Sequence, residues 1–372
     1  MSSRRDFLKT GFYGLGSIAA TFALSACSTL DEFVFEDQFD LKDQVLIVGG
    51  GISGLYLAYK LRQIKTEYRL YEGSGYLGGR IRSYQDLDFG ASVFDQSDVL
   101  VQALVKEFNL KTTTIAKGHF FIEGGAEKMT QFLLKRIAGL MPYRSLRLKW
   151  KMVGIYKYKD YYEVLFESPN GRRTITAKKV ALAIPPSQWG RIDGLLNLPE
   201  MDWARSWLST LQPESATKMQ VIVPNSPATL ALSNKRNNFE ATLEKQKLLV
   251  IGKALKNNLM GLEFEYLIKQ TLSNEKFKIE SVSMIEIEKI IELINSKTNL
   301  NLSSKKITAD SFYDWSTVSL IQSSYFKNDF PIPAQAKANH HFQVFGDYSS
   351  AIKPNTVEGA MQEANRISSL FV

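Results

Sequence analysis

One short stretch, residues 45–54, restricts the possible folds more than any other part of the sequence. A continuous apolar run, Val45 to Val48, is followed by GGGISG, in which Gly49, Gly51 and Gly54 have the spacing G-x-G-x-x-G. An unbroken apolar run of this length is typical of a parallel strand that is buried on both faces. In such a pattern the first glycine permits a tight turn, the second a close approach of the backbone to a pyrophosphate, and the third close packing of helix on strand. The stretch therefore predicts a strand, a turn and a helix that bind a dinucleotide.

The residues behind this turn complete the predicted unit. Apolar residues at helical spacing come next, and a second apolar strand, Tyr68 to Tyr71, ends in Glu72, 23 residues after Gly49. An acid at this place accepts hydrogen bonds from the ribose hydroxyls of the adenosine. The first turn of the helix, which contains Ser53, offers backbone N–H groups and a positive dipole end to the phosphates. We therefore predict an α/β fold that begins with a βαβ dinucleotide-binding unit.

A second glycine motif distinguishes between the possible dinucleotides. The segment GSGYLGGRIRS contains the pair Gly78 and Gly79, followed by Arg80. It resembles the second glycine motif of the flavin-containing amine oxidase superfamily, which includes monoamine and polyamine oxidases and, more distantly, carotenoid desaturases. The resemblance implies that the paired glycines let the loop lie against FAD. It also implies that Arg80 neutralises the pyrophosphate with its fork of donors.

The resemblance continues in the same order to the end of the chain. The segments LDFGASVF, FIEGGAEKMTQFL and KKVALAIPPSQW resemble family segments that contact or return to the cofactor domain. Near the C-terminus, the acid after a glycine bonds the ribityl chain or phosphate in the family, and the next helix points its N-terminus at the flavin's pyrimidine carbonyl. The implied cofactor-binding residues are Gly49, Gly51, Ser53, Gly54, Glu72, Gly78, Gly79, Arg80, Gly90, Ala91, Gly346, Asp347, Val357 and Glu358.

Three residues are candidates for the substrate side of the site. Lys218 lies in a segment that resembles the family's strand whose lysine holds a water near flavin N5, and an ordinary exposed strand lysine is the alternative. Trp315 matches the tryptophan that precedes the substrate-cage segment. Tyr325 falls where monoamine oxidases place the first tyrosine of an aromatic cage, or is a plain core residue. The second cage tyrosine would fall at Thr356, so the cage is incomplete.

The chain is shorter than most members of the family at one place. Only residues 111–122 lie between the predicted helix at residues 97–110 and Glu123, where most members insert a large, mainly helical module. We expect an FAD-binding Rossmann-like domain interrupted by a truncated α+β substrate domain, whose pocket is either more open or closed by a partner or the membrane. The predicted divisions are a signal peptide (1–26), a tether (27–43), a first FAD-binding part (44–125), a mixed segment returning to that domain (126–190), the truncated substrate domain (191–325) and a C-terminal FAD-binding part (326–372).

The N-terminus has the features of a bacterial export signal. Arg4-Arg5 lies in SRRDFLK, which resembles the twin-arginine signal of proteins that are exported already folded. Leu24-Ser25-Ala26-Cys27 resembles a lipobox, in which the cysteine becomes lipidated. The residue after it, Ser28, favours the outer membrane by resemblance to lipoprotein sorting. A protein loaded with FAD in the cytoplasm would need such a folded route, so we expect a lipoprotein on the periplasmic side of a membrane.

Composition restricts the cofactor attachment and the partners. The formal net charge of +8 is spread along the chain, and no basic tract resembles a nucleic-acid-binding arm. The one cysteine, Cys27, is assigned to the lipid anchor, and the three histidines are expected at surface or packing positions. FAD should therefore be bound non-covalently, and no metal site is expected.

The resemblance implies an enzyme, an FAD-dependent oxidoreductase that oxidises a small-molecule amine by hydride transfer to the flavin. Two alternatives stay open. One is a desaturase or dehydrogenase of an apolar, membrane-derived molecule, and the other is a flavoprotein without turnover that carries electrons or binds a partner.

Overall fold

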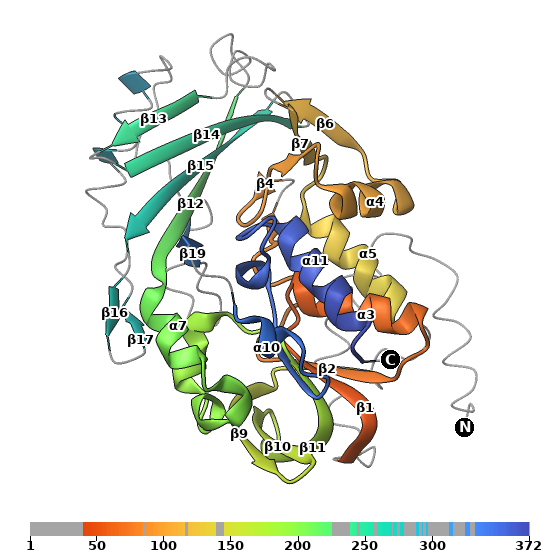
Figure 1. Cartoon of the computed structure of the whole chain (residues 1–372). Helices are drawn as coiled ribbons and strands as arrows, with labels where there is room; N and C mark the ends of the chain where they lie inside the picture. The colour runs from red at the N-terminus through yellow and green to blue at the C-terminus, as the bar shows by residue number, and fades with distance from the viewer. Residues whose placement is uncertain are drawn as a thin grey trace, which may run out of the picture. The chain divides into compact units, whose positions relative to one another are not determined.

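The structure is a computed structural model (Figure 1). It describes residues 40–84, 87–115, 118–138, 145–224, 239–243, 246–255, 259–269, 271–273, 276–278, 288–289, 292, 295–296, 312–314, 324–327 and 332–371. The predicted signal peptide, Cys27 and Trp315 lie outside these residues. Among the described residues, no helix is long and apolar enough to span a membrane.

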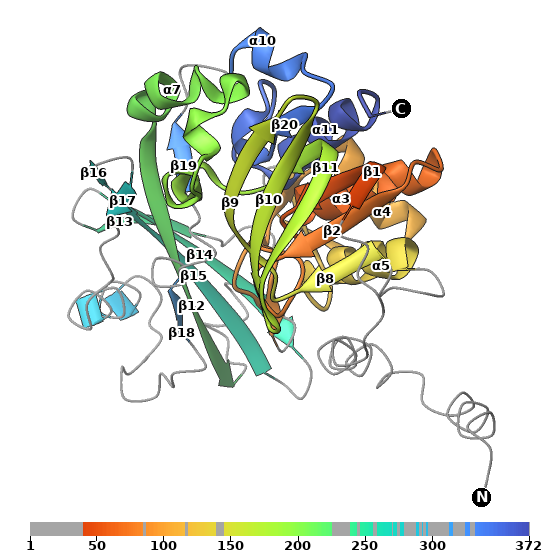
Figure 2. The ribbon, with the colours of Figure 1, turned by 90° about the horizontal axis from the view of Figure 1, so that it is seen from below.

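A mixed seven-stranded sheet forms the centre of the first domain (Figure 2). Its strand order is β8 (Leu146–Leu148), β2 (Tyr68–Glu72), β1 (Asp40–Val48), β11 (Gly171–Leu182), β10 (Tyr161–Ser168) and β9 (Lys151–Tyr158), with β20 (Phe342–Val344) also paired to β11. The strands β8, β2, β1, β11 and β20 pair in parallel, whereas β9 and β10 are antiparallel additions. The predicted strands at residues 45–48 and 68–71 are therefore neighbours in this sheet. β1 begins at Asp40, inside the segment predicted to be tether.

The apolar run of β1 is continuous because both faces of the strand are covered. Val45 and Leu46 alternate in direction, and both are 0% exposed. On one face, α3 (Ile52–Gln63) packs between α5 (Glu127–Ala138) and α11 (Val357–Ser368), as Figure 1 shows. On the other face, Leu46 belongs to a core cluster that includes Trp189 and Trp207. This burial on two sides is what the unbroken run predicts.

Residues 186–210 cover the face of the sheet opposite α3. It consists of three 3-10 helices, η3 (Pro186–Arg191), η4 (Leu195–Asn197) and η5 (Pro199–Met201), and of α7 (Ala204–Thr210). Trp189, Trp203 and Trp207 pack with ring centroids 5.7–6.1 Å apart. Nearby, the Tyr162 hydroxyl donates to Glu200 Oε1 at 2.7 Å, and Lys157 forms an ion pair with the same oxygen. Burial alone would raise the pKa of Glu200, but these hydrogen bonds outweigh it and lower the pKa.

Short elements connect the glycine motifs to α5. They are β3 (Ser83–Tyr84), β4 (Leu87–Asp88), β5 (Phe94–Asp95), α4 (Val99–Glu107), β6 (Thr112–Ile115) and β7 (His119–Ile122). β6 and β7 pair as an antiparallel hairpin at the place where the family's helical module was expected to be missing. The absence of that module relative to the family stays a prediction.

Ser83, which ends the second glycine motif, fixes the start of α5. Its hydroxyl accepts a hydrogen bond from Glu127 N at 3.0 Å, and its own backbone N–H donates to the Glu127 carboxylate at 2.8 Å. The buried Asp88 accepts from Ala126 N at 2.7 Å. These bonds satisfy amides at the helix start, which have no partner within the helix. The motif loop is thereby held against the helix.

The remaining strands form a separate antiparallel sheet within the predicted substrate domain. Its order is β13 (Phe239–Leu243), β14 (Gln246–Leu255), β15 (Leu259–Lys269), β12 (Gln212–Pro224) and β18 (Phe312–Asp314), with β19 (Ser324–Lys327) also paired to β12. A small hairpin, β16 (Thr271–Ser273) and β17 (Lys276–Lys278), lies beside it in sequence. After these strands, α10 (Ala334–Lys337), β20 and η8 (Asp347–Ser349) lead back to the first domain.

Candidate functional site

The two glycine motifs meet directly. The loop between β1 and α3 pairs with the second motif, because Gly78 N donates to Gly50 O at 2.8 Å and Gly51 and Gly78 form a parallel bridge. Gly51 is the N-cap of α3, with extended backbone angles φ −70° and ψ −179°. The amides of the first α3 turn and the second glycine loop therefore face one space, the arrangement that phosphate binding at a helix N-terminus needs.

Glu72 lies at the end of β2, where the sequence predicts it, and its carboxylate also organises the loop. Oε2 accepts a hydrogen bond from Gly50 N at 2.6 Å, and Oε1 accepts from Ser74 N at 2.7 Å. A carboxylate oxygen has two lone pairs, so each can accept a second hydrogen bond from a ligand hydroxyl. The Glu72 side chain thus holds the turn and remains suited to a ribose.

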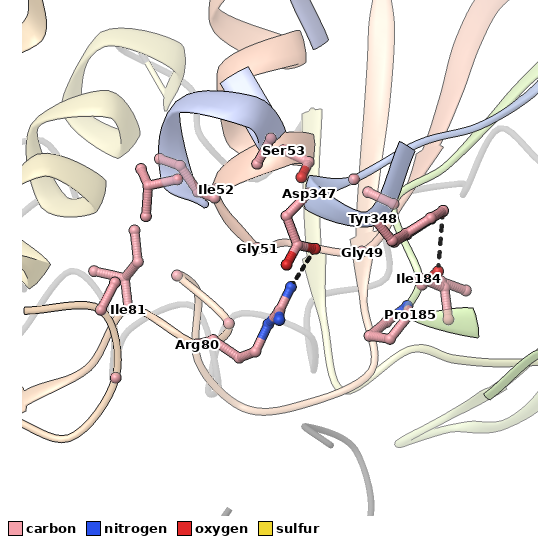
Figure 3. Close-up of a pocket in the computed structure, with 18 of the residues that line it drawn as sticks. Gly49, Gly51, Ile52, Ser53, Arg80, Ile81, Ile184, Pro185, Asp347 and Tyr348 are labelled. Atoms are coloured by element: carbon pink, nitrogen blue, oxygen red, sulfur yellow. Dashed lines mark hydrogen bonds and ion pairs between the residues drawn. The ribbon is translucent and has the colours of Figure 1, made fainter. Parts of the chain in front are cut away.

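Arg80 and Asp347, predicted from motifs 267 residues apart, form an ion pair. Arg80 Nη2 lies 2.5 Å from Asp347 Oδ1, and the side chains are 33% and 9% exposed (Figure 3). The pair lies between the first turn of α3, marked by Gly51, and the wall formed by Ile184 and Pro185. The second glycine motif and the C-terminal motif therefore converge at the point where a pyrophosphate would be neutralised.

Gly51, Glu72, Gly78, Arg80 and Asp347 line one cavity of about 690 Å³. This volume lies within the range of ligand pockets. Twelve of the fourteen predicted cofactor-binding residues line it, namely Gly49, Gly51, Ser53, Glu72, Gly78, Gly79, Arg80, Gly90, Ala91, Gly346, Asp347 and Val357.

The other two predicted cofactor-binding residues, Gly54 and Glu358, do not line the cavity. Gly54 lies inside α3, where an added Cβ would come within 2.0 Å of Gly49 O, so it serves the packing of helix on turn. Glu358 is 2% exposed and does not line the cavity. Its carboxylate instead accepts hydrogen bonds from the backbone of Leu100 and Val101 in α4. The Glu358 side chain therefore joins α11 to α4 and does not face the cavity.

One end of the cavity carries charged residues that the sequence did not indicate. Lys353 Nζ donates to Asp98 Oδ1 at 2.8 Å, and His119 Nε2 lies 3.5 Å from Asp95 Oδ2. The hydrogen bond to Asp98 raises the pKa of Lys353 above its ordinary value, so this lysine is charged. Hydrogen bonds from Ser97 lower the pKa of Asp95. His119 was expected at a surface or packing position; its side chain is 39% exposed, and it also lines the cavity.

Tyr348 forms part of the opposite wall. Its hydroxyl donates to Ile184 O at 3.4 Å, and its ring lies 5.7 Å from that of Trp189. Burial, followed by the charge of Asp347, raises the pKa of Tyr348 well above its usual value, so the hydroxyl stays neutral. No sequence pattern distinguishes this tyrosine. It lies on the cavity wall because β20, which precedes it in the chain, pairs with β11.

The candidate catalytic residues are placed only in part. Lys218 lies in β12, paired with Glu265 of β15 and Tyr313 of β18. Tyr325 lies in β19 and pairs with Glu214 of β12. Because strand residues alternate between faces, the positions of Tyr325 and Lys218 fall on the same face of the sheet. Trp315 lies outside the described residues. Within the described ranges, no group of His, Cys, Asp or Glu is arranged to hold a metal ion.

Comparisons with known proteins agree with this geometry. Residues 47–108 match the family model of an NAD(P)-binding Rossmann-like domain. No curated protein matches the sequence. Among solved structures, cyclohexylamine oxidase from Brevibacterium oxydans IH-35A has a TM-score of 0.64 and 12% identity, covering 88% of this chain and 98% of that chain. Wild-type putrescine oxidase bound to putrescine has a TM-score of 0.60 and 13% identity, covering 89% and 99%.

At these identities the likeness establishes the fold. The chain has a Rossmann-like dinucleotide-binding domain with a mixed α/β sheet, and its fold is similar to that of the putrescine oxidase and cyclohexylamine oxidase structures. The fold class predicted from the glycine motifs is confirmed.

Proposed function

We propose that the chain is an FAD-dependent oxidoreductase that oxidises a small-molecule amine. The observation that carries the proposal is the convergence of motifs at residues 49–54, 78–80, 90–91 and 346–357 on one cavity. These segments are far apart in sequence, and the Arg80–Asp347 ion pair joins two of them. We base the proposal on this site because a fold by itself does not determine function.

The residues of the cavity fit FAD. The first turn of α3 and the glycine pair would hold the pyrophosphate, with Arg80 turning part of its donor fork from Asp347 to the phosphate oxygens. Glu72 would accept hydrogen bonds from the adenosine ribose. An added Cβ at Gly51 would find its nearest heavy atom at 3.9 Å, so a ligand can come close to this backbone. Bound FAD would supply the hydride acceptor, and the chain would supply orientation and the exclusion of water.

We propose that the cofactor is bound without a covalent link. The one cysteine, Cys27, is the predicted site of the lipid anchor. His119 lines the cavity and is the one histidine there among the described residues, so it offers a direct test. Acid precipitation should release free FAD to the supernatant. Colour that stays in the pellet of the wild type but not of His119→Ala would show a histidyl link instead.

The substrate side of the proposal rests on β12 and β19. Lys218 would hold a water near the reacting face of the flavin, and Trp315 and Tyr325 would contribute aromatic surface to an amine. Putrescine oxidase and cyclohexylamine oxidase, whose architecture this chain shares, act on amines by name. The predicted lipid anchor at Cys27 would place the enzyme at a membrane on the periplasmic side. A partner or the membrane itself would close the shortened substrate domain.

A panel of mono- and diamines tests the activity. Anaerobic addition of a substrate should bleach the flavin absorbance, and addition of oxygen should restore it with formation of hydrogen peroxide. Gly51→Val, which should lack FAD, is the matched control for contaminating oxidases. If a membrane-lipid extract bleaches the flavin and no peroxide forms, the result would contradict amine oxidation and favour dehydrogenation of an apolar molecule. No bleaching by either class would contradict the proposal of an oxidase and favour a flavoprotein without turnover.

A further inference from the structure

Two helices begin side by side at the charged end of the cavity, and a buried carboxylate joins them. Glu358, in the first turn of α11, is 2% exposed. Its Oε2 accepts hydrogen bonds from Leu100 N at 2.9 Å and from Val101 N at 3.0 Å, and Oε1 lies 3.2 Å from Leu100 N. Gln362 Nε2 donates to Oε1 at 3.3 Å. Glu358 therefore satisfies the first amides of α4 from a different helix.

A second contact links the same two segments in the opposite direction. Asp98, the N-cap of α4, has a side chain that is 8% exposed. It accepts a hydrogen bond from Lys353 Nζ at 2.8 Å, and the same ammonium donates to Ser97 Oγ at 2.6 Å. The start of α11 is capped within its own segment, because Gly359 N donates to Thr356 Oγ1 at 3.0 Å. We call the two contacts between the segments the α4–α11 latch.

The latch forms part of the cavity wall. Asp95 and Asp98, before α4, line the cavity, as do Lys353, Thr356 and Val357 around the start of α11. The carboxylate of Glu358 is behind Val357 in sequence and is the most buried charge of this group. If the two helix starts moved apart, this end of the cavity would open.

We infer that Glu358 is a positioning residue that holds the start of α11 against α4 and so fixes the neighbouring wall residues Thr356 and Val357 of the cavity. The inference rests on the proposed function only where it concerns bound FAD. A negative charge near a ring that becomes electron-rich on reduction disfavours that reduction. With the flavin ring bound beside the start of α11, the Glu358 carboxylate would therefore lower the affinity for reduced FAD relative to oxidised FAD, whereas its bonds to α4 order this wall before any ligand enters.

Three variants separate the hydrogen bonds that Glu358 makes to α4 from the charge of its carboxylate. Glu358→Ala removes both, whereas Glu358→Gln keeps an acceptor oxygen for α4 but removes the charge. Glu363→Gln is the matched control, because Glu363 is on the same helix and 6% exposed, pairs with Lys337 and Arg366, and does not line the cavity.

Hydrogen exchange in the apo-protein tests the link. Glu358→Ala should speed exchange of the Leu100 and Val101 amides roughly ten- to a hundredfold, because it removes hydrogen bonds to a charged acceptor. Glu358→Gln should have a smaller effect and Glu363→Gln none at these amides. Unchanged exchange in Glu358→Ala would overturn the inference, and this result does not depend on FAD.

Reduction potentials of the reconstituted protein test the charge. Both Glu358 variants should raise the potential, with a change of about tenfold in the ratio of affinities for reduced and oxidised FAD, or about 30 mV for two electrons. Glu363→Gln should leave the potential at the wild-type value. Equal potentials in all four proteins would show that Glu358 is merely structural. Failure of the wild type to bind FAD would refute the proposed function and leave the exchange test standing.

Discussion

Replacement of Gly51 by valine should abolish cofactor binding and leave the fold intact. Gly51 has extended backbone angles, φ −70° and ψ −179°, that valine adopts without strain. An added Cβ would meet no protein atom closer than 3.9 Å, the Cα of Gly79. Because Gly51 lines the cavity between α3 and Arg80, the new methyl groups would project where the pyrophosphate is expected (Figure 3).

The magnitudes follow from these contacts. Loss of glycine from a compatible position stabilises the folded state by about 0.4–1 kcal/mol, and a poorer helix N-cap costs about 1 kcal/mol. The net change in the free energy of unfolding should therefore lie within about 1 kcal/mol of zero. Displacing the pyrophosphate loses about two hydrogen bonds to a charged group, each worth about 1.5–3 kcal/mol, so FAD affinity should fall roughly 10²- to 10⁴-fold.

Gly54→Ala is the matched control. Its Cβ would lie 2.0 Å from Gly49 O, a backbone atom, so α3 must move away from the turn after β1. Overpacking of this kind costs about 1–3 kcal/mol or more. We expect Gly54→Ala to lower the melting temperature of the apo-protein, whereas Gly51→Val should not.

Urea unfolding of the apo-proteins and fluorescence titration with FAD would measure both quantities. Gly51→Val with wild-type FAD affinity would refute the placement of the pyrophosphate at this helix start. Gly51→Val that unfolds as readily as Gly54→Ala would refute the division between a binding glycine and a packing glycine.

Three further predictions concern the reaction, the fold and the export route. Lys218→Met should keep FAD but slow its reoxidation by oxygen roughly ten- to a hundredfold, from loss of a contact worth about 1.5–3 kcal/mol; an unchanged rate in stopped flow would return Lys218 to an ordinary strand residue. The folded-state pKa of Glu200 lies below its ordinary value of 4.5, so its stabilising effect is present above that pH and is lost as the pH falls through the folded value. The melting temperature of Glu200→Gln should accordingly fall less than that of the wild type as the pH drops below 4.5, and parallel curves would contradict this. Arg4-Arg5→Lys-Lys should retain the precursor in the cytoplasm and Cys27→Ala should give an exported protein without lipid, as cell fractionation would show; undiminished export with paired lysines would exclude the twin-arginine route.

The local part of the fold was predictable because its causes are local. The apolar run before Gly49 and the acid at Glu72 predict β1, α3 and β2 with their ends almost in place. The start of β1 was missed by five residues, because Asp40 and Leu41 pair with Thr176 and Ala177 of β11. That partner strand is about 130 residues away, and no pattern near residue 40 indicates it.

The site was predictable as a set of residues but not as a set of contacts. Arg80 and Asp347 were each indicated by a motif, yet their ion pair depends on the return of the chain through β20. The Glu358 side chain was expected at the cofactor, and its bonds to Leu100 and Val101 arise only when α11 lies beside α4. Spacing in a sequence predicts which residues lie at a helix start, but packing decides where a buried carboxylate finds its donors.

The identity of the bound dinucleotide tests the central claim most directly. The purified mature chain should show the two visible absorbance bands of an oxidised flavin. Acid precipitation should release one equivalent of FAD per chain, identified by mass spectrometry of the supernatant, and Gly51→Val prepared in parallel should release almost none. A colourless protein that fails to take up added FAD, or that releases a nicotinamide dinucleotide instead, would contradict the assignment of this cavity.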